Sequence, residues 1–358
     1  IPSFDRGGAE KQLALLAAGL PRDEFDVHVA ALTRGGPIGD DLAAAGVPAT
    51  VIGKSWRADP RAYTKLLRHV RQLKPSLVHT WIFAANCSGR AAAMQAGVPH
   101  RIASERCVDR WKMPYQFALD RFFARRSDRV VVNSSGVLEF YADHGIPREK
   151  LVLIPNGVPP APPSTVTRAE VLRRLELPDD AHVVAAVGRL WPQKRLEDFI
   201  WSIELLRHVD PRARLVIIGD GPLRDRLERY TRRVRVEHLV HFAGHRDDVP
   251  ELLPHFDVLA LTSGYEGMPN SVMEAMAAGV PVVATDIPGN RDLVVADETG
   301  YLVPVGARDE LTQCFVRLLE DPELRRRFGE AGRRRVAACF GVEQMVDRHA
   351  ELYRELLA

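Results

Sequence analysis

Residues 258–285 read VLALTSGYEGMPNSVMEAMAAGVPVVAT and decide the fold class. A short β-rich run at 258–261 leads through a glycine-containing loop to a run of helical period at 271–278, and a second β-rich run follows at 282–284. A strand, a helix and a strand in this order predict two parallel strands joined by a crossover helix. The segment therefore indicates an α/β protein with parallel sheets.

The same alternation continues along the chain on both sides of this segment. The further strand candidates are short β-rich runs followed by a turn and a helical stretch, and they lie at 27–32, 77–79, 130–133, 151–154, 183–187, 215–218 and 239–242. A first helix is expected to begin at or just after Gly7 and Gly8. Because open parallel sheets bind ligands outside the carboxyl ends of their strands, the residues after each strand are the site candidates.

Two domains are expected, since 358 residues exceed what one hydrophobic core usually serves. Residues 155–167 contain five prolines, and proline ends both helices and strands, so this segment is the predicted linker. We place the first domain at 1–158 and the second at 159–342. The opening run Ile1-Pro2-Ser3 reads like the tail of a strand, so the first strand is expected to be truncated.

Charge and cysteine content exclude several classes of protein. The 49 basic residues nearly balance the 47 acidic ones, and a net charge of +2 gives no field that would indicate nucleic acid as the partner. The four cysteines form no C-x-x-C pair, so neither a zinc site nor a disulfide framework is indicated, and a reducing cytoplasm fits best. Uncharged apolar runs stay well below the roughly 18 residues that cross a bilayer, so any membrane contact is expected to be peripheral.

Fixed positive charges follow the predicted strand at 183–187. Residues 188–195 read GRLWPQKR and place Arg189 and Lys194 between the end of a strand and the start of a helix. Arginine and lysine both bind phosphate oxygens, and a helix N-terminus adds free N–H groups. The pattern indicates a diphosphate site, with a solvated charged turn as the alternative.

Two carboxylates eight residues apart, Glu266 and Glu274, follow the strand at 258–261. Gly267 permits close backbone approach to a ligand, and Asn270 is a good N-cap for a helix that starts at residue 271. Carboxylates accept hydrogen bonds from sugar hydroxyls without needing a metal. The pair suits hydroxyl groups at opposite ends of one polar ligand, and a capping acid with a surface acid is the alternative.

Several motifs match a known family in order and spacing. They are GRL at 188–190 with Lys194, GDGPL at 219–223, E-x7-E at 266–274 running into AMAAGVPVVA at 275–284, GGAE at 7–10, NS at 133–134 and IPNGV at 154–158. With these motifs the chain resembles glycosyltransferase family 4. The resemblance implies an α/β GT-B architecture of two Rossmann-like domains facing a central cleft, a retaining mechanism without an essential metal, and a last helix, 343–358, that returns to the first domain.

The resemblance also implies the site residues. Catalytic roles fall on His79, Arg189, Lys194 and Glu266, with the two cations on the diphosphate. Donor binding falls on Gly7, Gly8, Gly188, Gly267, Met268, Pro269, Asn270, Ser271, Val272 and Glu274. Glu274 matches the acid that binds the ribose, and His79 matches a histidine near the donor sugar.

The expected activity is transfer of a sugar from a nucleotide sugar to a glycan, a lipid-linked acceptor or a small molecule. The expected donor is a UDP- or GDP-sugar, and the expected location is the cytoplasm. No metal and no cofactor besides this substrate are expected, and the chain has no D-x-D pair of aspartates. It also lacks the G-x-G-x-x-G fingerprint of a nicotinamide dehydrogenase. A GT-B sugar-nucleotide epimerase and a non-catalytic sugar-nucleotide-binding protein are the alternatives.

Residues 101–129 combine eight basic residues and four acidic ones with interspersed aromatic residues. This composition suits an anionic lipid-linked acceptor or peripheral contact with the inner face of a membrane. The alternative is an amphipathic helix whose aromatic residues belong to the core and whose arginines are solvated.

Overall fold

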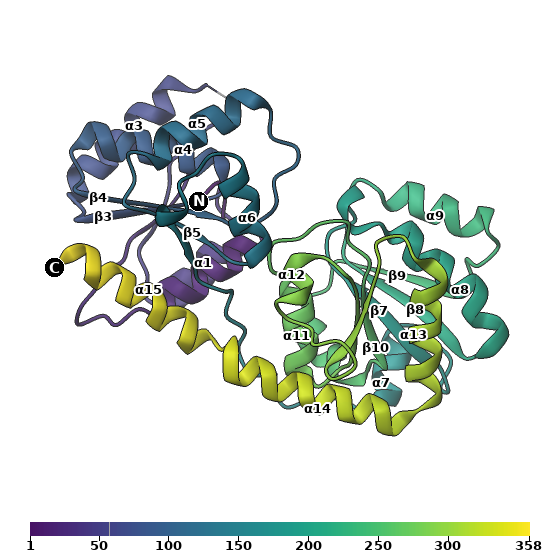
Figure 1. Cartoon of the computed structure of the whole chain (residues 1–358). Helices are drawn as coiled ribbons and strands as arrows, with labels where there is room; N and C mark the ends of the chain where they lie inside the picture. Colours follow the sequence, from purple (N-terminus) through teal and green to yellow (C-terminus); the bar gives the residue numbers. More distant parts are fainter. Residues whose placement is uncertain (57) are drawn as a thin grey trace. The chain divides into compact units, whose positions relative to one another are not determined.

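The computed structural model describes residues 1–56 and 58–358, which divide into two compact units. Unit 1 comprises Ile1–Gly157 and Val342–Ala358, and unit 2 comprises Val158–Gly341. These boundaries lie one residue from those expected from the sequence. Figure 1 traces both units in the colours of the sequence, with the last helix in yellow.

Unit 1 is built on parallel strands. A four-stranded sheet has the order β3-β4-β5-β6, and β1 and β2 form a parallel pair of their own. The bounds are β1 Val29–Ala31, β2 Ala49–Val51, β3 Leu77–Trp81, β4 His100–Glu105, β5 Arg129–Val132 and β6 Leu151–Leu153. In the register Thr80 lies opposite Ala103, which in turn lies opposite Val130, so the carboxyl ends of the strands share one edge.

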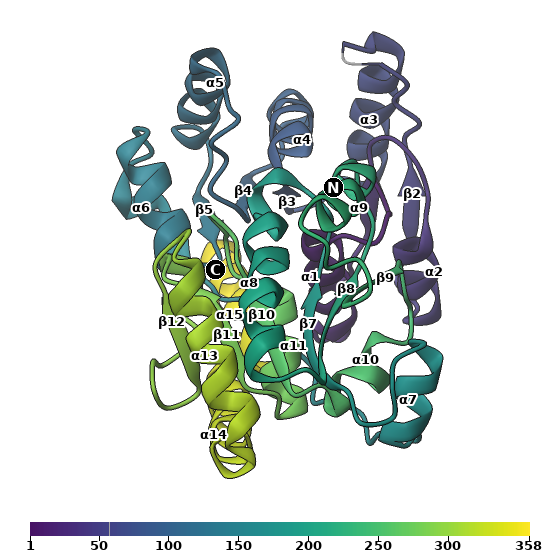
Figure 2. The same ribbon diagram turned by 90° about the vertical axis from the view of Figure 1, so that its right-hand side faces the viewer.

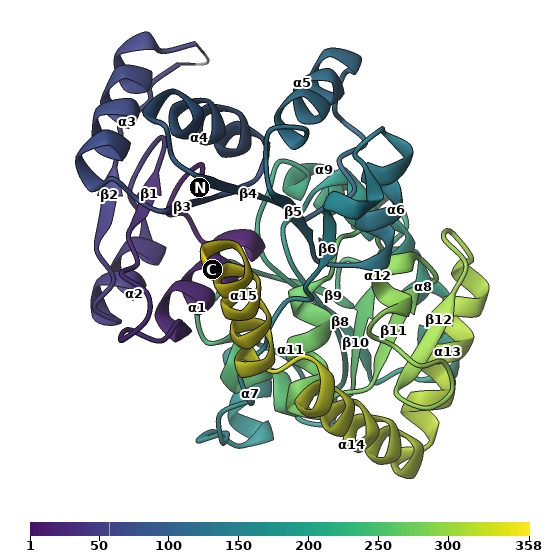
Figure 3. The ribbon, with the colours of Figure 1, turned by 60° about the vertical axis from the view of Figure 1, so that its left-hand side comes forward.

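The helices of unit 1 cover both faces of its sheet. They are α1 Gly8–Gly19, α2 Pro37–Ala44, α3 Pro60–Leu73, α4 Phe83–Ala96, α5 Pro114–Ala124, α6 Ser135–Asp143 and α15 Val342–Leu357. Asp59 caps α3 by accepting from the backbone N–H of Arg61 and Ala62, and Pro60 occupies the first turn, where its missing N–H costs nothing. Figure 3 shows α15 beside α1, where Met345 and Val346 enter the same core as Leu16.

Unit 2 contains a six-stranded parallel sheet in the order β12-β11-β10-β7-β8-β9. The bounds are β7 His182–Val187, β8 Ala213–Ile218, β9 Val240–Gly244, β10 Val258–Leu261, β11 Val282–Thr285 and β12 Gly300–Val303. Along β7, Val183 and Ala185 enter one core while Val184 and Ala186 enter the other, as expected for a strand covered on both faces.

The helices of unit 2 are α7 Arg168–Arg174, α8 Leu196–Val209, α9 Arg224–Arg233, α10 Val249–Leu252, α11 Asn270–Ala278, α12 Pro288–Arg291, α13 Arg308–Glu320 and α14 Pro322–Cys339. Residues of α7 and α11 pack on one face of the sheet, and residues of α8, α9 and α13 pack on the other. Figure 2 shows α8 and α13 in front of this sheet. Among the described residues, no helix is long and apolar enough to cross a membrane.

Every predicted strand is present, with shifts of up to two residues at its ends. Three strands escaped prediction: β2, β4 and β12. The strand β4 reads HRIASE, and its charged and small residues hide the β pattern although four of its six residues are buried. The predicted helix start at residue 271 is wrong by one position, because α11 begins at Asn270 with Pro269 as its N-cap.

Candidate functional site

The two predicted cations lie directly after β7. Gly188 directly follows this strand with φ 150°, a value that L side chains rarely adopt, and the short 3-10 helix Pro192–Lys194 (η2) comes after it. A Cβ on Gly219 would lie 2.1 Å from the Gly188 carbonyl oxygen, so these two strand ends pack backbone to backbone. The glycines thereby let the loop that carries Arg189 and Lys194 lie close to the sheet.

The side chain of Lys194, in the loop after β7, contacts the carboxylate of Glu266, in the loop after β10. Its Nζ lies 2.8 Å from Oε1 of Glu266, which also accepts a 2.6 Å hydrogen bond from Oγ of Ser263. Nε2 of Gln193 donates to Oε2 over 3.2 Å. Glu266 is buried and held by three donors, and the sequence analysis had selected neither Gln193 nor Ser263 as a site residue.

Arg189 and Lys194 line a small hollow at the carboxyl ends of β7 and β10, together with Gly188 and Thr262. The guanidinium of Arg189 stacks over the ring of Trp191, 4.5 Å from its centroid. Two cations after one strand, one of them fixed by a carboxylate from the loop after the neighbouring strand, form a positively charged position for an anionic ligand.

The loop around Glu266 is tied to its neighbours through the backbone. The N–H of Gly264 donates to the carbonyl oxygen of Gln193 over 2.8 Å, and Oγ1 of Thr285 donates to the carbonyl oxygen of Ser263 over 2.6 Å. A Cβ on Gly289 would lie 1.9 Å from the carbonyl oxygen of Gly267, so α12 packs directly against this loop. The carboxylate of Glu266 is therefore held on a rigid support.

The predicted donor-binding residues from 267 to 274 follow in one continuous stretch. Met268 is buried, and Pro269 and Asn270 begin α11. Ser271 and Val272 lie in the first turn of this helix, where the geometry leaves backbone N–H groups without a helical acceptor. Glu274 lies in the second turn and is partly exposed. Glu266, these N–H groups and Glu274 thus share one side of unit 2, at the loop after β10.

In unit 1, the predicted Gly7 and Gly8 lie at the start of α1. Gly7 is the N-cap residue, and its carbonyl oxygen accepts the first helical hydrogen bond from the N–H of Lys11. A Cβ on Gly7 would lie 2.2 Å from Oε2 of Glu10. The prediction that the first helix begins at or just after these glycines is confirmed.

His79 lies in the middle of β3, because the strand extends two residues beyond its predicted end. Both ring nitrogens have partners in unit 1: Nδ1 lies 2.7 Å from Oη of Tyr353, and Nε2 lies 2.8 Å from Oγ of Ser104. Burial, with a smaller contribution from His349, holds the pKa of His79 well below its usual value. The imidazole is therefore neutral and fixed in orientation.

A buried charged cluster follows β4 and was not predicted. Nζ of Lys112 lies 3.4 Å from Glu105, 3.2 Å from Asp109 and 2.9 Å from Asp120. Oη of Tyr141 lies within 2.9 Å of both Glu105 and Asp109. Burial alone would lower the pKa of Lys112, but the three carboxylates raise it above its usual value. The ammonium group is therefore charged and serves as the centre of a structural network.

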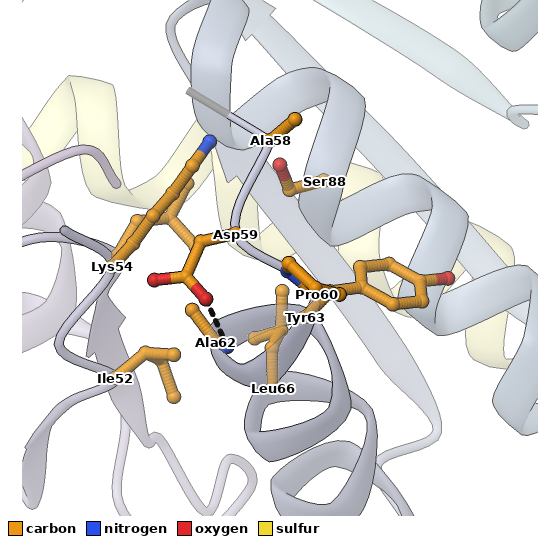
Figure 4. A pocket seen from close by; sticks show the side chains of 10 residues that line it. Ile52, Lys54, Ala58, Asp59, Pro60, Ala62, Tyr63, Leu66 and Ser88 are labelled. Atoms are coloured by element: carbon orange, nitrogen blue, oxygen red, sulfur yellow. Dashed lines mark hydrogen bonds between the residues drawn. The ribbon is translucent and has the colours of Figure 1, made fainter. Parts of the chain in front are cut away.

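Unit 1 also contains a cavity of about 280 Å³ near the carboxyl ends of β1 and β2. Figure 4 shows its apolar wall with Lys54 on one side, Ser88 on the other, and the Asp59 carboxylate turned to the backbone of α3. Leu66 and Tyr63 belong to this wall. Its place beyond strand ends is one where parallel sheets bind ligands.

Two family profiles match the chain and together cover most of it. The profile described as "Glycosyltransferase Family 4" matches residues 6–161, and the profile described as "Glycosyl transferases group 1" matches residues 167–335. The crystal structure of Anabaena HepE in complex with UDP-glucose is similar in fold, with a TM-score of 0.90 and 22% identity over 99% of this chain and 98% of that chain. This likeness shows the fold.

Curated relatives agree with the profiles. An Escherichia coli UDP-Gal:alpha-D-GlcNAc-diphosphoundecaprenol alpha-1,3-galactosyltransferase is 28% identical over 363 residues, 94% of this chain and 91% of the relative. A Mycobacterium tuberculosis GDP-mannose-dependent alpha-mannosyltransferase is 31% identical over 284 residues, 76% of this chain and 71% of the relative. The chain therefore belongs to glycosyltransferase family 4, with the GT-B fold, and is a nucleotide-sugar-dependent glycosyltransferase.

Proposed function

We propose that the protein is a retaining, metal-independent hexosyltransferase that takes its sugar from a UDP- or GDP-sugar and passes it to a glycan or a lipid-linked acceptor. The observation that carries the proposal is the cluster of Lys194, Glu266, Gln193 and Ser263 beside Arg189, at the carboxyl ends of β7 and β10. Its cations suit a diphosphate, and its carboxylate suits sugar hydroxyls.

The hard step of the reaction is loss of the nucleoside diphosphate from the anomeric carbon. Negative charge grows on the bridging phosphate oxygen as this bond breaks, and a fixed cation stabilises that charge in the transition state. Lys194 is fixed by Glu266, and Arg189 by its stacking on Trp191, so neither cation needs to reorganise during the step. In the proposal these two residues bind the leaving diphosphate and stabilise its negative charge.

Glu266 has a second role in the proposal. A carboxylate offers about four acceptor positions, of which the recorded bonds from Lys194, Ser263 and Gln193 occupy three. The remaining position on Oε2 is assigned to a hydroxyl of the donor sugar. The backbone N–H groups of Ser271 and Val272 are assigned to phosphate oxygens, and Glu274 to the ribose.

Retention and metal independence belong to the proposal and have separate supports. Two relatives are named as alpha-transferases that use UDP-Gal and GDP-mannose, donors whose sugars are themselves α-linked to the diphosphate. Metal independence is carried over from the family resemblance, and the absence of a D-x-D pair of aspartates from the sequence is consistent with it. The acceptor hydroxyl would attack the face that the diphosphate leaves, and the phosphate itself would take the acceptor proton.

Unit 1 supplies the remaining parts of the proposal. Gly7 and Gly8 are assigned to the donor loop and His79 to the surroundings of the donor sugar, as the resemblance implies. The cavity lined by Lys54 and Tyr63 is assigned to the acceptor, because it lies beyond the ends of β1 and β2. One relative is named for a lipid diphosphate acceptor, which supports a lipid-linked acceptor and a peripheral, cytoplasmic place at a membrane.

The test is a screen of UDP-galactose, UDP-glucose, UDP-N-acetylglucosamine and GDP-mannose for binding and slow hydrolysis, with EDTA present throughout. We expect one donor to bind and hydrolyse, and the released sugar to carry the α configuration when NMR detects it at early times. Glu266→Ala and Arg189→Ala should each lose hydrolysis, whereas Arg173→Ala, an exposed arginine on α7, should keep it. If hydrolysis disappears on addition of EDTA and returns with a divalent metal, metal independence is refuted.

The comparisons do not favour the two alternatives, an epimerase and a non-catalytic binding protein, because the relatives are named glycosyltransferases. The same screen separates them. An epimerase would release an altered free sugar, and a binding protein would bind the donor without hydrolysing it. Either result would replace the proposal.

A further inference from the structure

The helix α5 of unit 1 and the turn before it expose an unusual number of large apolar side chains. These side chains form what we call the outer face: Trp111, Met113, Tyr115, Leu119 and Phe122. Trp111, Met113 and Tyr115 are each 54–57% exposed, and Phe122 is 44% exposed. Figures 2 and 3 show α5 at the periphery of unit 1, next to α4. The alternative interpretation, that the aromatic residues of 101–129 belong to the core, is wrong for Trp111, Tyr115 and Phe122, whereas Phe123 is buried.

The inner side of α5 contains two polar residues besides the apolar Phe123 and Ala124, which is unusual for a helix with large apolar residues on its outer side. Gln116 and Asp120 are buried, and both have specific partners. Oε1 of Gln116 accepts from the N–H of Met113 over 2.8 Å, and Oδ2 of Asp120 accepts from Nζ of Lys112 over 2.9 Å. Rotating the helix to bury its outer face would break the bond between Asp120 and the buried Lys112. The outward direction of the apolar residues is therefore fixed by the fold.

Within residues 110–126, the exposed charges have one sign. Arg110, Arg125 and Arg126 are exposed, and Arg121 is half-buried. The only acidic residue from 110 to 126 is Asp120, which points inward. The guanidinium of Arg126 stacks on the ring of Phe122, 3.8 Å from its centroid, so positive charge lies directly against the apolar surface.

We infer that the outer face of α5 docks on an anionic lipid surface, with the helix lying in the plane of the interface. Tryptophan and tyrosine favour the headgroup level, and arginines beside them attract anionic headgroups. A helix of 11 residues is too short to span a bilayer but suits shallow insertion. An apolar protein partner would not require that the exposed charges of residues 110–126 all be basic.

This inference rests on the proposed function for its purpose, which is to hold the enzyme where a lipid-linked acceptor is found. Membrane docking is nevertheless a separate property, because the donor cluster lies in unit 2 and the outer face lies in unit 1. Flotation and donor hydrolysis, measured on the same preparations, therefore distinguish failure of one from failure of the other.

The experiment is flotation of the full chain with vesicles of phosphatidylcholine containing about 30% phosphatidylglycerol, against pure phosphatidylcholine vesicles, in low and high salt. We expect flotation with the anionic vesicles in low salt only. The triple variant Trp111→Ser, Tyr115→Ser, Phe122→Ser should lose about tenfold or more of the partition coefficient. A matched control replaces exposed apolar residues elsewhere, Trp56→Ser, Leu205→Ser and Val209→Ser, and should float like the wild type.

A second pair of variants tests the charges. Arg125→Gln with Arg126→Gln should weaken partition roughly twenty-fivefold, because each arginine contributes about fivefold. Arg232→Gln with Arg233→Gln, an equally exposed arginine pair in the last turn of α9, should leave partition unchanged. Circular dichroism and donor hydrolysis check that every variant is folded.

Three outcomes would overturn the inference. The wild type could fail to float, the triple variant could float as well as its control, or the outer face could instead cause self-association that the triple variant abolishes in light scattering. If flotation fails while donor hydrolysis persists, the proposed function stands without membrane docking. If flotation persists without any donor binding, the proposed function fails and the docking surface remains.

Discussion

Lys112 in unit 1 and Lys194 in unit 2 are each paired with carboxylates after a strand of a parallel sheet, yet their surroundings differ. Lys112 is fully buried among three carboxylates and Tyr141, so its ammonium group interacts only with groups inside the protein. Lys194 has one carboxylate partner, Glu266, and lines a hollow at the strand ends. The difference teaches that a charged pair at a strand end can serve either stability or ligand binding, and that burial decides which.

The same substitution at the two lysines gives the sharpest test. Lys112→Met leaves Glu105 and Asp109 without a cation, while Asp120 keeps only Arg90 at 3.9 Å. Removing one partner of a buried ion pair costs about 3–5 kcal/mol. We expect the free energy of unfolding of unit 1 to fall by this amount in urea titrations. A change below about 1 kcal/mol would show that the cluster is not structural.

Lys194→Met should act on catalysis instead. Loss of one fixed cation from a transition state lowers kcat by roughly 10²–10³ in comparable sites. Because Ser263 and Gln193 still donate to Glu266, we expect unfolding in urea to shift by no more than about 1 kcal/mol. Donor hydrolysis at saturating donor gives kcat, and a normal rate with lost stability would reverse the comparison.

The buried histidines of unit 1 should make it sensitive to acid. Burial lowers the pKa of His349 from its usual value of 6.5 to about 3. Between pH 6.5 and about pH 3, this histidine is therefore protonated in the unfolded chain but neutral in the folded unit. Stability is therefore full above pH 6.5 and is lost as pH falls, by about 1 kcal/mol from pH 7 to pH 5.5. Urea midpoints at both values measure the loss.

Burial also raises the pKa of Asp120 to about 6, and this raised pKa makes the folded state more stable as pH falls, opposite to the effect of His349. The prediction is therefore tested by comparing the pH dependence of variants. His349→Leu should show a flatter pH dependence than the wild type. His245→Leu, at an exposed histidine of unit 2, should keep the wild-type dependence. Equal slopes in all three proteins would refute the assignment to His349.

Tyr353→Phe has the smallest expected effect and tests His79. It removes the 2.7 Å hydrogen bond to Nδ1 of His79, at a cost of about 1 kcal/mol in the free energy of unfolding. Tyr301→Phe, at a partly buried tyrosine of unit 2, is the matched control. A fall in kcat beyond that of the control would support the proposed place of His79 near the donor sugar, and an unchanged kcat with lost stability would contradict it.

The sequence predicted most of the fold because apolar runs of β character are local signals. The strand β10 has its predicted bounds, and α15 begins one residue before its predicted start. The strand β4 was missed because its buried polar residues take their partners from distant parts of the chain, as Glu105 does from Tyr141 and Asn86. Such partners are invisible to a pattern read along the sequence.

The site shows the same division. The loop order placed Arg189, Lys194 and Glu266 among the candidates, and the structure brings Lys194 and Glu266 together. Periodicity could not show that His79 would bond to Tyr353, 274 residues away, or that α5 would turn its apolar residues outward. The direction of that helix depends on the inward pull of Lys112 on Asp120, which is a tertiary contact.

The return of α15 to unit 1 has a consequence for how the protein is made. Unit 1 takes residues from both ends of the described chain, and Tyr353 reaches His79 only after the whole of unit 2 has been synthesised. During translation, the core of unit 1 therefore stays incomplete until α15 is made, whereas unit 2, a continuous segment, can fold earlier. A nascent chain stalled before residue 342 would present the hydrophobic side chains of α1 to chaperones.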